Sequence, residues 1–306
     1  MADFREKVRE LIRLLPEVER REGEPMCGHT SFRIGGRTAL MLLPRSAEEL
    51  ERSFVCCRKL GVAPLIIGNG TNLLVEEGEL ELAVIKTHGG LEGVRLLNGT
   101  EIEAESGALL ARIAVFAMEH SLTGLEFAHG IPGSVGGAAV MNAGAYGGEM
   151  KDVIVRTLAL DEQGREFTLT GAEHDFSYRH SAFTGGDVVL KTVIRLEKGD
   201  GAAIRGRMEE LMAKRRASQP LNYPSAGSTF KRPAGGYAAA LIDEAGLKGY
   251  RVGGAMVSEK HAGFVINAGG ATFDDVLAVM EHVRETVFRR YGIELEPEVR
   301  IIRGRS

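Results

Sequence analysis

The sequence predicts an α+β protein built from two or three lobes. Helical and strand patterns alternate along all 306 residues, and no segment repeats another. A hydrophobic share of 44% is enough to form sizeable cores, and a chain of this length corresponds to about two domains of roughly 150 residues. The pattern breaks at residues 219–224, which contain two prolines, so we place a domain boundary there.

Short strands alternate with amphipathic helices before this boundary. Ser46 with Glu49 forms a capping box, which predicts a helix that ends near residue 60. By the spacing of their apolar residues, further helices are predicted over 3–20, 109–124 and 202–217, and strands over 38–43, 62–67, 83–105, 152–160 and 187–196.

The part after the boundary contains one long helix and several short elements. Thr272 and Asp275 predict the start of a helix over 273–291, and Gly292 predicts its end. A helix over 237–245, short strands within 253–267 and a last strand over 298–302 complete the predicted fold.

Charge and cysteine usage restrict the class of protein. The formal net charge is −4, whereas a surface for nucleic acid or anionic membrane would be basic. Cys27, Cys56 and Cys57 form no disulfide framework, which favours a reducing compartment. The N-terminus carries no apolar signal core, and no apolar run is long enough to cross a bilayer. We therefore expect a cytoplasmic protein with no nucleic-acid, membrane or obligate protein partner.

Glycines are concentrated in one segment, residues 129–138. Its glycines allow successive backbone N–H groups to form an anion nest, Pro132 stiffens the turn, and Ser134 offers a hydroxyl donor. A helix beginning at Ala138 would add its positive end, so a diphosphate is the natural occupant. A tight turn packed against another backbone segment is the alternative interpretation.

A second glycine loop, Gly68-Asn69-Gly70-Thr71-Asn72, follows the strand predicted at 62–67. Taken alone, it is equally consistent with a structural turn. Together, the two loops favour a dinucleotide held between two subdomains. The chain has no third glycine of a Rossmann fingerprint, no Walker sequence, no glycine–x–serine–x–glycine elbow and no histidine spacing typical of a metal site. The sequence therefore predicts no metal.

Six segments in order resemble the UDP-N-acetylenolpyruvoylglucosamine reductase family, whose flavin domain is of the vanillyl-alcohol-oxidase (PCMH) type. They are the two glycine loops, Met-Asn-Ala-Gly-Ala-Tyr-Gly at 141–147, Tyr-Arg at 178–179, Ala-Gly-Ser-Thr-Phe-Lys at 226–231 and Leu-Glu-Pro-Glu-Val-Arg at 295–300. The match extends from about residue 29 to 302, nearly the whole chain.

The resemblance implies a two-lobed FAD-binding domain and a C-terminal α+β substrate domain. The corresponding divisions are FAD subdomain 1 at 1–78, FAD subdomain 2 at 79–218 and the substrate domain at 219–306. It implies non-covalent FAD, NADPH as co-substrate, and reduction of the enolpyruvyl group of a UDP-sugar to UDP-N-acetylmuramate. No insertion is visible between residues 194 and 219, which favours the subtype without an extra tyrosine loop over the substrate.

The resemblance also assigns site residues. Arg179 would bind the carboxylate, Glu298 would support the developing enol, and Ser228 would deliver a proton to the alpha carbon. Without the resemblance, an arginine after a tyrosine indicates a surface ion pair, Ser228 a turn residue and Glu298 an exposed strand residue. Expected FAD contacts are Gly68, Asn69, Gly70, Thr71, Asn72, Gly130, Ile131, Pro132, Gly133, Ser134, Gly136, Gly137, Asn142 and Gly144, and expected substrate contacts are Tyr178, Lys231, Lys260 and Asn267.

Two alternatives stay open at this level. One is an FAD oxidase of the same fold that acts on an alcohol or sugar, with His129 placed to attach the flavin covalently. The other is a nucleotide-binding module without catalysis. Flavin that remains with acid-precipitated protein would favour the first, and a colourless preparation that FAD does not reconstitute would favour the second.

Overall fold

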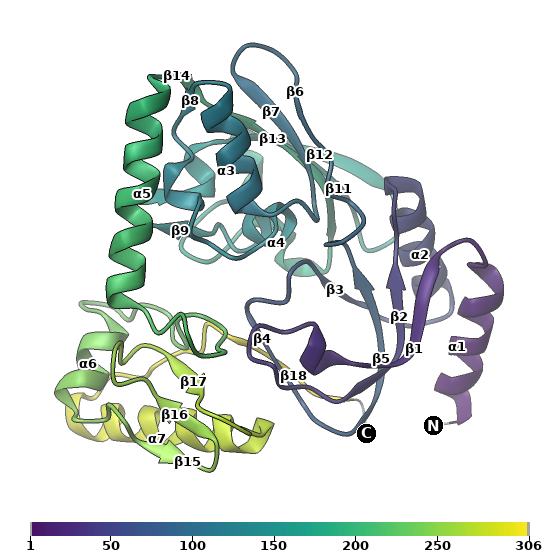
Figure 1. Ribbon diagram of the computed structural model, residues 1–306. Coiled ribbons are helices and arrows are strands. Elements are labelled where there is room, and N and C mark those ends of the chain that lie inside the picture. The colour runs from purple at the N-terminus through teal and green to yellow at the C-terminus, as the bar shows by residue number, and fades with distance from the viewer. Residues whose placement is uncertain (1, 305–306) are drawn as a thin grey trace. The chain divides into compact units, whose positions relative to one another are not determined.

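The computed structural model describes residues 2–304 (Figure 1). The chain divides into two compact units, each assembled from separate segments. Unit 1 comprises the chain up to Glu22, Ala39–Asn69 and Leu82–Lys214. Unit 2 comprises Gly23–Thr38, Gly70–Glu81 and the chain from Arg215 onward, close to the boundary expected at 219–224. The finer division into three parts stays a prediction.

The larger sheet of unit 1 has five antiparallel strands in the order β12-β11-β13-β7-β6. Helix α4 (Val135–Val140) packs on β13, and helix α3 (Leu110–Glu119) contributes to the same buried core. The strands are β6 (Val94–Leu96), β7 (Glu101–Glu105), β11 (Ile154–Leu160), β12 (Glu166–Thr170) and β13 (Val188–Arg195).

A second sheet has the order β1-β2-β5-β3, with β3 parallel to β5. Helices α1 (Ala2–Leu14) and α2 (Ala47–Lys59) pack together over an apolar core that lies within unit 1. Ser46 Oγ accepts the amide of Glu49 at 3.2 Å, as the capping box predicts. The strands are β1 (Glu19–Pro25), β2 (Arg37–Leu43), β3 (Leu65–Ile67) and β5 (Glu79–Lys86).

Smaller pairs complete unit 1. Strand β8 (Leu122–Thr123) pairs with β14 (Glu197–Lys198), and β9 (Gly144–Ala145) pairs with β10 (Gly148–Glu149). Helix α5 (Gly201–Ser218) packs through Ile204 and Met208 and continues past the boundary of the unit. Between residues 194 and 219, β14 and α5 occupy nearly all of the chain, which supports the subtype without the extra loop.

Unit 2 is built around helix α7 (Phe273–Tyr291), which packs on the antiparallel sheet β15-β16-β17 (Figure 1). The predicted capping box of Thr272 and Asp275 is present, and Gly292 closes the helix with φ 68°. Strand β18 (Arg300–Ile302) pairs in parallel with β4 (Leu73–Val75). The remaining elements are α6 (Ala238–Glu244), β15 (Arg251–Val252), β16 (Ala255–Val257) and β17 (Val265–Asn267).

Several local predictions were wrong. The helix expected over 3–20 ends at Leu14, because Pro16 cannot continue it, and β1 follows at Glu19. The strand expected over 62–67 begins only at Leu65, after Pro64. Helix α4 begins at Val135, three residues before the expected Ala138.

None of the helices within residues 2–304 combines the length and apolar character that a membrane span requires.

Candidate active site

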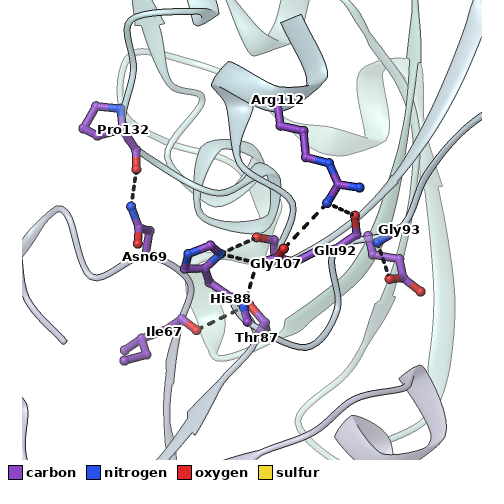
Figure 2. Close-up of polar contacts among 11 residues, drawn as sticks. Ile67, Asn69, Thr87, His88, Glu92, Gly93, Gly107, Arg112 and Pro132 are labelled. Atoms are coloured by element: carbon purple, nitrogen blue, oxygen red, sulfur yellow. Dashed lines mark hydrogen bonds and ion pairs between the residues drawn. The ribbon is translucent and has the colours of Figure 1, made fainter. Parts of the chain in front are cut away.

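The two predicted glycine loops lie against each other within unit 1. Asn69 Nδ2 donates a hydrogen bond of 2.7 Å to the carbonyl of Pro132 (Figure 2). A Cβ atom on Gly68 would overlap Ser134 Oγ and lie 2.9 Å from Ser134 Cβ. Glycine at position 68 therefore allows the end of β3 to approach the start of α4. We call Gly68, Asn69 and residues 129–137 the cradle.

Three buried polar atoms around the cradle have no hydrogen-bond partner among the described residues. They are Ser106 Oγ, His129 Nδ1 and Ser134 Oγ. A buried polar group without a hydrogen-bond partner costs about 1–3 kcal/mol of stability. A bound ligand that supplies the partner removes this cost, so such groups are expected where a ligand binds. A diphosphate accepts hydrogen bonds from hydroxyl and backbone N–H groups, and Ser134 beside a glycine backbone offers such donors. The cradle therefore fits the diphosphate of FAD.

At least four backbone amides of the cradle are engaged within the protein. His129 N donates to Glu126 O at 3.3 Å, and Ile131 N donates to Ala128 O at 3.0 Å. Val135 N donates to Ala108 O at 2.8 Å, and Gly136 N donates to Ser106 O at 2.9 Å. Gly136 packs so closely that a Cβ would lie 2.8 Å from Ser106 Cβ. The packing of α4 against the segment after β7 thus accounts for Gly136, while Gly137 is exposed.

The segment after β5 supports the cradle from a neighbouring parallel strand. Thr87 N donates to Ile67 O at 2.9 Å, next to Gly68. His88 Nδ1 lies 2.6 Å from Glu92 Oε1 and 3.2 Å from Gly107 O (Figure 2). These contacts fix the turn after β5 against Gly107, which lies in the segment after β7 that packs on α4.

The second half of the Gly68–Asn72 loop belongs to unit 2. Ser31 N donates to Gly70 O at 3.1 Å, and Ser31 Oγ donates to Thr71 O at 3.3 Å. Asn72 Nδ2 donates to Glu298 O at 3.0 Å, and Asn72 O accepts the amide of Arg300 at 3.0 Å. Asn72 therefore fixes the backbone of a predicted catalytic residue.

Ser228 and Glu298 lie on two hydrogen-bonded segments of unit 2. Glu298 N donates to Thr229 O at 2.8 Å, and Phe230 forms a bridge with Pro297. Thr229 is also bound on its other side, because its Oγ1 accepts the amide of Val265 at 2.9 Å. Ser228 is exposed and Glu298 half-buried, so both stand on firmly held backbone with access to a ligand.

Arg179 belongs to unit 1 and occupies an unusual backbone conformation, φ 55°. Its guanidinium lies 5.0 Å from the ring centroid of Tyr178, a cation–π contact. Tyr178 is 42% exposed. Asn142 is fully buried near the same turn, and Gly144 lies in β9, where it pairs with Glu149.

The other predicted substrate contacts have partners within unit 2. Lys231 Nζ contacts Glu296, and Lys260 Nζ donates to Arg216 O at 2.5 Å. The amide of Asn267 donates to Phe32 O at 3.2 Å and accepts the amides of Gly269 and Ala271, both at 3.1 Å. Lys231 and Lys260 can exchange a surface partner for a ligand, whereas Asn267 is committed to its turn.

Residues 38–170 match the model of an FAD binding domain, and residues 219–302 match the C-terminal domain of UDP-N-acetylenolpyruvoylglucosamine reductase. A protein of that name from Caldanaerobacter subterraneus is 49% identical over 96% of this chain and 97% of its own length. The chain belongs to the UDP-N-acetylenolpyruvoylglucosamine reductase family. It is an FAD-dependent oxidoreductase, and the predicted family is confirmed.

Further members of the reductase family agree with this assignment. The reductase of Syntrophomonas wolfei is 45% identical over 96% of this chain and 98% of its own length. The crystal structure of the Thermus caldophilus reductase matches with a TM-score of 0.80 and 33% identity, and the match covers 94% of this chain and 99% of that chain.

A solved structure outside this family has a similar fold. It is a berberine bridge enzyme variant, 16% identical, with a TM-score of 0.50, and the match covers 63% of this chain and 44% of that chain. The predicted α+β flavin fold is confirmed.

Sequence reasoning missed several residues that pack around the candidate site. Thr87 follows β5 and lies at the cradle because adjacent parallel strands end at the same edge of a sheet. The position of Thr87 follows from the sequence once the parallel pairing of β3 with β5 is known. Ser106, which packs against Gly136, and Glu149, which pairs with Gly144, carry no local signal, because these contacts depend on tertiary packing.

Proposed function

We propose that this chain reduces the enolpyruvyl double bond of UDP-N-acetylglucosamine enolpyruvate with NADPH. The product is UDP-N-acetylmuramate, a precursor of peptidoglycan. The observation that carries this proposal is membership of the reductase family over 96% of the chain. We carry the catalytic roles that the family resemblance implies to Arg179, Ser228 and Glu298. The same membership favours the reductase over the oxidase and the non-catalytic module considered above.

The cradle holds FAD in this proposal. Gly68, Asn69, Gly130, Ile131, Pro132, Gly133, Ser134 and Gly137 are the residues proposed to surround its diphosphate, with Ser134 Oγ as the buried donor. When bound there, FAD would supply hydride transfer from NADPH to the terminal carbon of the enolpyruvyl group.

The chain's own residues then manage the charge and the proton. Hydride addition at the terminal carbon moves an electron pair onto the alpha carbon and its carboxylate, and a proton must follow to complete saturation of the bond. Arg179 offers a planar, permanently charged group to that carboxylate. Ser228, exposed on its fixed segment, donates the proton to the alpha carbon, and Glu298 hydrogen-bonds the developing enol.

Tyr178, Lys231 and Lys260 are proposed to contact the UDP-sugar. Asn267 contributes by holding its turn, because its amide bonds three backbone groups. The three cysteines are all unpaired, which supports a location in the cytoplasm, and the reaction requires only small molecules. No obligate protein partner is part of the proposal.

We expect the enolpyruvyl substrate to trigger NADPH consumption. The decisive measurement is anaerobic: enzyme reduced with one equivalent of NADPH is mixed with the substrate, and the flavin absorbance is followed. Return of the oxidised spectrum supports the proposal. Reduced enzyme that substrate does not reoxidise would falsify it, and UDP-N-acetylglucosamine without the enolpyruvyl group serves as the control.

The flavin is proposed to be bound without a covalent bond. His129 belongs to the cradle and its Nδ1 is buried, so a covalent link there is the specific alternative. We expect acid precipitation to release all yellow colour into the supernatant. Flavin bound covalently through His129 would instead stay with the pellet of the unaltered protein but not with the pellet of His129→Ala.

A further inference from the structure

The turn that carries Arg179 is strained. Ser177 and His180 close it through two reciprocal backbone hydrogen bonds of 3.2 Å, so Tyr178 and Arg179 are its two central residues. The second central position has φ 55°, a left-handed conformation that glycine adopts freely and other residues adopt at a cost of about 1–2 kcal/mol. Neighbouring structure must therefore hold this turn in place.

Two anchors hold the turn, one on each side. Asn142 Nδ2 donates to Ser177 O at 2.9 Å, and Ser181 Oγ donates to Val140 O at 2.7 Å. Asn142 and Ser181 are both fully buried. Val140 is the last residue of α4, and Asn142 follows two positions later. The end of the helix that begins at the cradle is thus tied to the turn that carries Arg179.

Both N–H donors of the Asn142 side chain are committed within the protein. Its second N–H donates to Glu149 Oε2 at 3.0 Å, and its Oδ1 accepts the amide of Lys151 at 2.9 Å. An asparagine amide has two N–H donors, and both are used within the protein. The sequence predicted Asn142 as an FAD contact, and this geometry favours a different role.

Glu149 links the amide of Asn142 to the charge of Arg179. Lys151 Nζ lies 2.8 Å from Glu149 Oε2, and its hydrogen bond holds the pKa of Glu149 below its ordinary value. The bond from Asn142 and the positive charge of Arg179 lower that pKa further. The carboxylate therefore stays ionised, and its charge and that of Arg179 attract each other.

We infer that Asn142 is a positioning residue that sets the direction of Arg179 through the carbonyl of Ser177. This inference rests on the proposed function, in which Arg179 meets the substrate carboxylate. Asn142 itself tolerates its own left-handed conformation, φ 41°, which asparagine adopts more readily than most residues. Its two N–H groups hold Ser177 and Glu149, so the side chain serves the turn and not the flavin.

The test is a double-mutant cycle on the full enzyme. Asn142→Gly removes the amide while accepting the left-handed backbone. We expect substrate-driven reoxidation to slow about 10- to 100-fold, the range in which a remote displacement of about 1 Å acts, while reduction by NADPH is unchanged. In an Arg179→Ala background the same change is expected to slow reoxidation less than about twofold, because coupled residues are not additive.

Asn98→Gly is the matched control. The Asn98 side chain also makes several hydrogen bonds, but in the turn between β6 and β7. Its Oδ1 accepts from Thr100 N, Thr100 Oγ1 and Glu101 N, and its Nδ2 donates to the Glu101 carboxylate. Asn98→Gly should alter the unfolding temperature and leave the rate of substrate-driven reoxidation unchanged. If Asn142→Gly does not fold, Asn142→Asp keeps the acceptor for Lys151 and lacks both donated hydrogens, and should show the same coupling.

The outcomes separate this inference from the proposed function. Equal slowing in both backgrounds, or purification of Asn142→Gly without flavin, overturns the positioning role. Unchanged reoxidation in Arg179→Ala alone contradicts the role of Arg179 in the proposed function instead. The inference is supported if Asn142→Gly slows reoxidation only in the enzyme that retains Arg179.

Discussion

Replacing Ser228 by alanine is expected to slow reoxidation by the enolpyruvyl substrate about 10²–10⁴-fold, the usual contribution of a positioned proton donor. Reduction by NADPH should proceed at the rate of the unaltered enzyme, because that half-reaction requires no proton at the alpha carbon. Ser228 is exposed, and its neighbour Thr229 is held from two sides, so the substitution removes one hydroxyl and leaves the backbone in place. Stopped-flow absorbance measures the two half-reactions separately.

Ser225→Ala is the matched control for this prediction. Ser225 lies three residues earlier on the same segment and contacts Ser31 through its backbone carbonyl, at 2.6 Å. It should retain both half-reactions. If Ser228→Ala slows both half-reactions equally, the serine acts on flavin binding or folding, and the proton donor must be sought elsewhere.

Replacing Gly68 by alanine is expected to weaken FAD binding by at least about tenfold. The added Cβ overlaps Ser134 Oγ and lies 2.9 Å from Ser134 Cβ, so the one buried hydroxyl of the cradle must leave its position. Loss of a charge-assisted hydrogen bond of about 1.5–3 kcal/mol corresponds to a change of this size. Titration of the flavin-free protein with FAD, followed by flavin fluorescence, gives the dissociation constant.

Two further variants make this result specific. Ser134→Ala removes the same hydroxyl without adding bulk and should weaken FAD binding in the same direction. Gly206→Ala, in an exposed turn of α5 where an added Cβ meets nothing within 4 Å, should leave FAD affinity unchanged and stabilise the helix by about 0.5–1 kcal/mol. Full FAD affinity in Gly68→Ala would show that the cradle does not hold the diphosphate.

Local signals predicted the fold well where they act alone. Helix α7 has the predicted bounds, because Thr272, Asp275 and Gly292 fix both of its ends through short-range hydrogen bonds and backbone preference. Strand β1 was missed, because its sequence is almost entirely charged and polar and its strand conformation comes from pairing with β2. Helix α4 begins earlier than predicted, because packing against Ser106 overrides the low helix propensity of Gly136.

In the candidate site too, some features follow from neighbouring residues and others depend on tertiary packing. The two glycine loops were predicted to hold one dinucleotide, which stays a prediction. The hydrogen bond from Asn69 to Pro132 brings part of the first loop against the second within unit 1. The commitment of Asn142 to Ser177, 35 residues away, depends on tertiary packing and has no signal in a single sequence. Family resemblance identified Asn142 as part of a motif, whereas only the geometry indicates what its side chain does.

The composition of unit 2 limits how this enzyme can be dissected. Its apolar core includes Phe32, Ile34 and Leu74, which precede the matched C-terminal domain by more than a hundred residues. A fragment that starts at residue 219 would lack these three side chains and the strand that β18 pairs with. Unit 2 is therefore completed by segments that include Phe32 and Leu74, and its core cannot form until synthesis of the chain has reached Val299.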